Sequence, residues 1–126
     1  MTLSRAIVSI DHHHALIQQF HGEDVQRKAV SEHTHNTRQH ASGVRSEHEF
    51  FGEVCDSLVG IAEVLVAGSH TAQADFRHYV EKHRPTLVAN IAGWETVDHL
   101  TNGQLVAFAR KFFVKHDNIA GTRPLV

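Results

Sequence analysis

The chain has 126 residues, of which 41% are hydrophobic and 21% are charged, which suits one domain with a single core. Its formal net charge of −2 excludes a protein whose whole surface attracts nucleic acid. The lone cysteine, Cys55, excludes an internal disulfide. The sequence has neither the apolar core of a signal peptide nor an apolar run that could span a bilayer. We therefore expect a cytoplasmic protein without membrane contact.

The first thirty residues predict three short strands. Residues 5–10 read RAIVSI and residues 15–20 read ALIQQF, and both stretches are rich in apolar and β-branched side chains. Gly22 marks a turn before a more polar third stretch over residues 25–30. Strands joined by tight turns pair as antiparallel neighbours, so a meander is expected. The Gln, Arg and Lys residues of the third strand favour a place at the sheet edge.

Residues 31–45 read SEHTHNTRQHASGVR and show no apolar periodicity. We predict a long exposed loop here. Loops of this length without regular structure are uncommon in compact domains and are often functional.

Helices and strands alternate in the rest of the chain. Ser46 and Glu49 have the spacing of a capping box, and an apolar stripe that begins at Phe50 predicts a helix ending near Gly60. The further predicted elements are a strand over 61–67, a helix over 71–83, a strand over 89–97 and a helix over 101–114. Residues 116–126 are expected to form a loosely ordered tail.

The predicted order is β-β-β-α-β-α-β-α, which combines an antiparallel meander with parallel strands joined by right-handed crossovers. The fold class is therefore α/β, with a mixed five-stranded sheet covered by helices, in a single domain over residues 1–126.

Several stretches carry a family resemblance. They are VLVAGS at 64–69, ADF at 74–76, GWETVDH at 93–99 and GQLVAFARKFF at 103–113. With the element order, the first two stretches make the chain similar to the ribonuclease H-like middle domain of archaeo-eukaryotic peptide-chain release factors and Pelota. The last two stretches, the Asp11-His12 turn and the histidine-rich loop make it resemble a group of short bacterial proteins named translational machinery proteins.

The resemblance implies a role for the predicted loop. In release factors the loop after the third strand carries Gly-Gly-Gln and enters the peptidyl-transferase centre. The equivalent stretch here runs from Thr34 to Arg45 and contains Gln39 without the two glycines. Because those glycines let the backbone bend close to its target, hydrolytic release is not expected.

A basic, histidine-rich loop can contact phosphates. Between Arg27 and Arg45 the sequence has four basic residues and only one acid, Glu32. The basic residues are Arg27, Lys28, Arg38 and Arg45. We predict that ribosomal RNA, tRNA or a ribosomal protein is contacted by six residues: His33, His35, Arg38, Gln39, His40 and Arg45.

Metal binding is a second possibility that the loop leaves open. His33, His35 and His40 lie close in sequence and could bind zinc or nickel, with His48 and the run His12–His14 as further imidazoles. The resemblance to a ribonuclease H-like fold also implies a carboxylate site for magnesium, for which the sequence offers five candidates: Asp11, Glu47, Glu49, Glu53 and Asp98. Cys55 lies on an apolar helical stripe and is expected to be an inert core thiol.

Three functions follow from these patterns. The leading hypothesis is a translation-associated binding protein that is not an enzyme. The alternative is a metal- or histidine-dependent hydrolase of an ester or phosphodiester. The third is a structural or protein-interaction domain, which could form a homodimer through its edge strand.

Overall fold

The structure, a computed structural model, describes residues 4–32 and 42–120, with side chains described through residue 32 and from 46 to 118. The strands are β1 Arg5–Ile10, β2 His14–His21, β3 Asp24–Ser31, β4 Glu63–Gly68 and β5 Ile91–Thr96. The helices are α1 Ser42–Ser57, α2 His70–His83, α3 Pro85–Val88 and α4 Asn102–Ala120. This confirms the predicted α/β class and the mixed five-stranded sheet.

The strands lie in the order β3-β2-β1-β4-β5. β2 is antiparallel to both β1 and β3, whereas β1, β4 and β5 are parallel to one another. Four strands, β1, β3, β4 and β5, therefore run in the same direction. β3 lies at an edge, as its polar side chains predicted.

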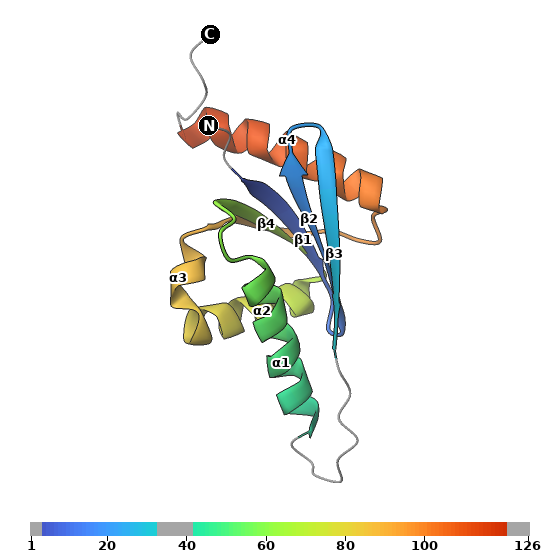
Figure 1. Cartoon of the computed structure of the whole chain (residues 1–126), viewed down its shortest axis with the longest axis vertical. Coiled ribbons are helices and arrows are strands. Elements are labelled where there is room, and N and C mark those ends of the chain that lie inside the picture. The colour runs from blue at the N-terminus through green and yellow to red at the C-terminus, as the bar shows by residue number, and fades with distance from the viewer. Residues whose placement is uncertain (1–3, 33–41, 121–126) are drawn as a thin grey trace.

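Helices cover both faces of the sheet (Figure 1). Side chains alternate along β1, so that Val8 faces α1 and α2 while Ile7 faces α4. On the first face Phe50 and Phe76 fill the core, and on the second face Phe113 does so. β1 and β4 are buried on both faces, which explains their nearly continuous apolar sequences.

α1 begins at Ser42, four residues before the predicted start at Ser46. Ser46 is 2% exposed and lies inside the helix, so the predicted capping box is wrong. A serine three residues before a glutamate fits a helix interior as well as a cap, so this pattern alone does not define where the helix begins. The predicted loop over 31–45 is shorter, because Ser31 belongs to β3 and residues 42–45 are helical.

The second half of the chain shows two further differences. Pro85 ends α2, as predicted, and also occupies the first turn of the short helix α3, where a fixed φ is favourable. α4 continues to Ala120, so residues 116–120 of the predicted tail are helical. No helix in the described part of the chain is both long and apolar enough to cross a membrane.

Candidate functional site

The carboxyl ends of β1, β3, β4 and β5 lie together along one side of the sheet, across the ends of the strands. We call this side the carboxyl edge, as distinct from the edge strands β3 and β5. Ligands of open α/β sheets bind at such edges. Gly68 ends β4 here, and a Cβ atom at this position would lie 2.2 Å from the carbonyl oxygen of Ile10. Glycine thus lets β4 approach β1 where the edge begins.

A fixed turn joins β1 to β2 at this edge. Asp11 Oδ1 accepts hydrogen bonds from the backbone N–H groups of His13 at 2.7 Å and His14 at 2.6 Å. The Asp11 N–H donates to the His14 carbonyl at 2.9 Å. Asp11, predicted as a magnesium ligand, therefore serves as the anchor of the turn.

The same turn is tied to the end of β3. The Glu32 N–H donates to the His13 carbonyl at 2.7 Å, and the Glu32 carboxylate lies 2.7 Å from His13 Nδ1. This hydrogen bond raises the pKa of His13 above its ordinary value. The residues that precede segment 33–41 are thereby held against the β1–β2 turn.

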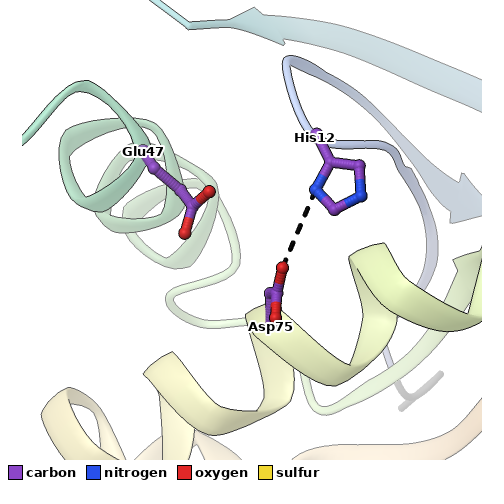
Figure 2. A group of neighbouring side chains, drawn as sticks. All are labelled: His12, Glu47 and Asp75. Carbon is purple, nitrogen blue, oxygen red and sulfur yellow. Dashed lines mark ion pairs between the residues drawn. The ribbon is translucent and has the colours of Figure 1, made fainter. Parts of the chain in front are cut away.

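His12, Glu47 and Asp75 form a cluster on the α1 and α2 side of the carboxyl edge, which we call the acid–histidine cluster. Figure 2 shows the three side chains converging from the β1–β2 turn, α1 and α2. One ligand atom from each residue lies within 4.8 Å of the other two. His12 Nδ1 and Asp75 Oδ2 are 3.8 Å apart.

A cavity of about 460 Å³ opens on the α4 side of the same edge. Its wall is apolar where Leu16 and Leu105 contribute, and its polar groups include Ser31, Ser69 and Asp98. The two sides of the edge thus differ, with a mainly apolar hollow on one and charged groups on the other.

The predicted basic cluster is divided between the two faces of the sheet. Arg27 Nε donates to Gln18 Oε1 at 2.8 Å, and Gln18, which is fully buried, donates to the Asn102 carbonyl at 3.3 Å. Lys28 pairs with Ile17, whose side chain lies in the core on the α1 and α2 face. Arg27 and Lys28 therefore cannot reach one surface together.

The predicted contact residues His33, His35, Arg38, Gln39 and His40 lie outside the described residues, and so do the three predicted metal ligands among them. Arg45 belongs to α1, and its side chain also lies outside the described part. The predicted contacts and metal ligation remain predictions.

Among the other predicted ligands within the described ranges, His12 and Glu47 converge and the rest do not. Of the five predicted carboxylates only Glu47 joins the acid–histidine cluster. The ring of His48 instead packs in tilted contact with Tyr79 and His83, with ring centroids 5.5 and 5.6 Å away. The exposed Asp98 pairs with its neighbour His99 at 3.3 Å. Sequence reasoning missed Asp75, because only the packing of α2 beside the turn brings it near His12.

Cys55 is 2% exposed, as the apolar stripe predicted. Burial raises the pKa of its thiol to about 11. A thiol in this state is a poor nucleophile, so Cys55 belongs to the core.

The similarity of this chain to known proteins lies in its fold. No protein-family profile matches the sequence, and no curated protein is similar to it. The structure is similar to that of Archaeoglobus fulgidus Pelota, with a TM-score of 0.64 and 19% identity over 94% of this chain. Thermoplasma acidophilum Pelota matches 84% of the chain with a TM-score of 0.60 and 19% identity. The archaeal translation termination factor aRF1 matches 94% with a TM-score of 0.52 and 17% identity.

These matches confirm the predicted resemblance in fold to Pelota and release factors, and they agree with similarity to the middle domain of those proteins. The chain spans 33% and 31% of the two Pelota chains and 42% of aRF1. At these identities the likeness establishes the fold, while function depends on the site.

Proposed function

We propose that this protein is a translation-associated binding protein that contacts ribosomal RNA, tRNA or a ribosomal protein through segment 33–41 and Arg45. The observation that carries the proposal is a shared fold over 94% of the chain with a translation termination factor, aRF1, and with Pelota. The proposed partner is a ribosome or a tRNA, and the proposed location is the cytoplasm.

The carboxyl edge supports the choice of segment. The chain leaves β3 at the edge, where His13 and Glu32 are bonded to each other, and it enters α1 at Ser42 (Figure 1). The segment therefore joins two elements with firmly packed neighbours, which suits a contact element on a rigid scaffold. Arg38 in the segment and Arg45 in α1 supply positive charge, and the three histidines of the segment add to it when they are protonated.

Cosedimentation with bacterial ribosomes through a sucrose gradient tests this proposal. The protein should migrate with ribosomes at low salt and be released at high salt, because each phosphate contact displaces counterions. The double variant Arg38→Ala/Arg45→Ala should remain at the top of the gradient. Lys82→Ala/Lys115→Ala is the matched control, since it removes the same charge from exposed positions in the last turn of α2 and near the end of α4.

Two results would count against the proposal. Wild-type protein that stays at the top at every salt concentration would remove the ribosome as partner. Equal loss of binding in both double variants would show that net charge alone, rather than segment 33–41, drives association.

A further inference from the structure

We propose that His12, Glu47 and Asp75 form a binding site for a divalent transition-metal ion, with zinc as the preferred ion. This site differs from the histidine-rich segment predicted from the sequence and does not depend on ribosome association. Its three ligands come from three separate elements, so the folded chain assembles the site.

The spacing is close to that of a metal site. Zinc bonds to imidazole nitrogen and carboxylate oxygen are about 2.0–2.2 Å long, so the ligand atoms of a tetrahedral site lie roughly 3.3 Å apart. Here Nδ1 of His12 and Oδ2 of Asp75 are 3.8 Å apart, and all three atoms lie within 4.8 Å. Small rotations of these partly exposed side chains bring the atoms onto one ion.

A neighbouring hydroxyl orients the imidazole. His12 Nε2 lies 3.2 Å from Thr71 Oγ1 in the first turn of α2. When Nε2–H donates to this oxygen, Nδ1 carries the lone pair and faces Asp75 and Glu47 (Figure 2). Metal-bound histidines are commonly held in this way by a hydrogen bond on the second ring nitrogen.

The charge of the acid–histidine cluster also favours the binding of a cation. Two carboxylates face one imidazole, and in the described part of the chain neither carboxylate pairs with an arginine or lysine. The hydrogen bonds of Asp11 hold the turn that carries His12, so this ligand needs little reordering when an ion binds. Imidazole together with carboxylates suits zinc better than magnesium, which prefers oxygen ligands throughout.

Three protein ligands leave a tetrahedral ion with one position open to water or to an oxygen of another molecule. The site therefore suits an ion that remains exchangeable at the surface, in contrast to a closed structural zinc site with four protein ligands.

Calorimetric titration of zinc into full-length untagged protein, purified without a metal column and stripped with EDTA, tests the site. We expect one ion per chain with micromolar or tighter affinity. Glu47→Gln and Asp75→Asn should each weaken binding at least about tenfold, while the fold is checked by circular dichroism. The control His33→Gln/His35→Gln/His40→Gln should retain the stoichiometric ion, which separates the cluster from the histidine-rich segment.

Thr71 provides a separate check, as a positioning residue. Thr71→Val should weaken zinc binding about tenfold, and Thr71→Ser should restore it, because only the hydroxyl is needed. Three results would overturn the site: no stoichiometric zinc in the wild type, unchanged affinity in both carboxylate variants, or loss of the ion in the triple histidine variant.

Discussion

Two groups of side chains, each with two carboxylates and one histidine, lie at opposite ends of the strands and differ in how their charges are balanced. At the amino ends of β1 and β4, Arg5 Nε lies 2.7 Å from Glu63 Oε1, and His116 Nε2 lies 2.9 Å from Glu63 Oε2. Arg5 also binds Asp117 through two guanidinium nitrogens, and its guanidinium lies over the ring of Phe113. We call this group the arginine network.

The acid–histidine cluster at the carboxyl edge has no comparable cation among the described residues. Its closest pair is 3.8 Å apart, with side chains 42% and 53% exposed, whereas Arg5 and Glu63 are each 21% exposed. The arginine network therefore places a guanidinium between its two carboxylates, while the two carboxylates of the cluster have no arginine or lysine partner among the described residues. The difference is consistent with a structural role for the first group and with the binding role that we propose for the second.

Removal of the arginine should have the largest effect on stability. Arg5→Ala leaves Glu63 and Asp117 partly buried without their guanidinium partner and should lower the free energy of unfolding by about 3 kcal/mol. Urea unfolding measures this loss, and circular dichroism should show fewer helical residues as the end of α4 frays.

Arg77→Ala serves as the control for that change. Arg77 and Glu81 are 3.9 Å apart and 57% exposed, so the loss of this pair and of the contact with Trp94 should cost no more than about 1 kcal/mol. Equal losses in the two variants would contradict the structural role of the arginine network.

A buried thiol adds a pH dependence that must be separated from both charged groups. The pKa of Cys55 is about 11 in the folded protein and near 9 when the thiol is exposed. Between these values the unfolded chain releases a proton that the folded chain retains, so stability should fall as pH rises from about 9 to 11, by roughly 2–3 kcal/mol.

Urea unfolding at a series of alkaline pH values measures this slope. Cys55→Ala should lower stability near neutral pH by leaving a small cavity, but it should flatten the dependence on pH, so that the difference from the wild type shrinks as pH rises. A slope that persists unchanged in the variant would assign the dependence to other groups.

The sequence predicted the elements that rest on a local apolar pattern. The strands over 5–10 and 61–67 were close to the observed bounds because short, nearly continuous apolar runs are typical of strands buried on both faces. The helix over 71–83 was close because its core-facing residues repeat at the helix spacing. The start of α1 was missed because Ser46 fits both a cap and a buried helical position. The end of α4 was missed because its polar contacts are long-range: Asp117 binds Arg5, which lies 112 residues away in sequence.

The candidate site was less predictable because it depends on contacts between distant parts of the chain. His12 and Glu47 were among the candidate ligands, but nothing local links Asp75 to either of them. Their proximity follows from the turn after β1, the packing of α1 and the placement of α2, which sequence periodicity does not define. Arg27 and Lys28 show the converse, because neighbours in sequence point to opposite faces of a strand.

The smallest effect is expected at the acid–histidine cluster when metal is absent. In EDTA, Asp75→Asn removes an exposed pair with His12 and also relieves repulsion from Glu47, so the free energy of unfolding should change by less than about 1 kcal/mol. Urea unfolding in EDTA measures this change, and urea unfolding in the presence of zinc measures how much the ion stabilises each protein. Zinc should stabilise the wild type more than Asp75→Asn, because an ion that binds only the folded state shifts the equilibrium toward it and the variant binds the ion at least about tenfold more weakly. A loss in EDTA as large as that of Arg5→Ala would instead make the cluster a second structural network and remove the contrast between the two edges.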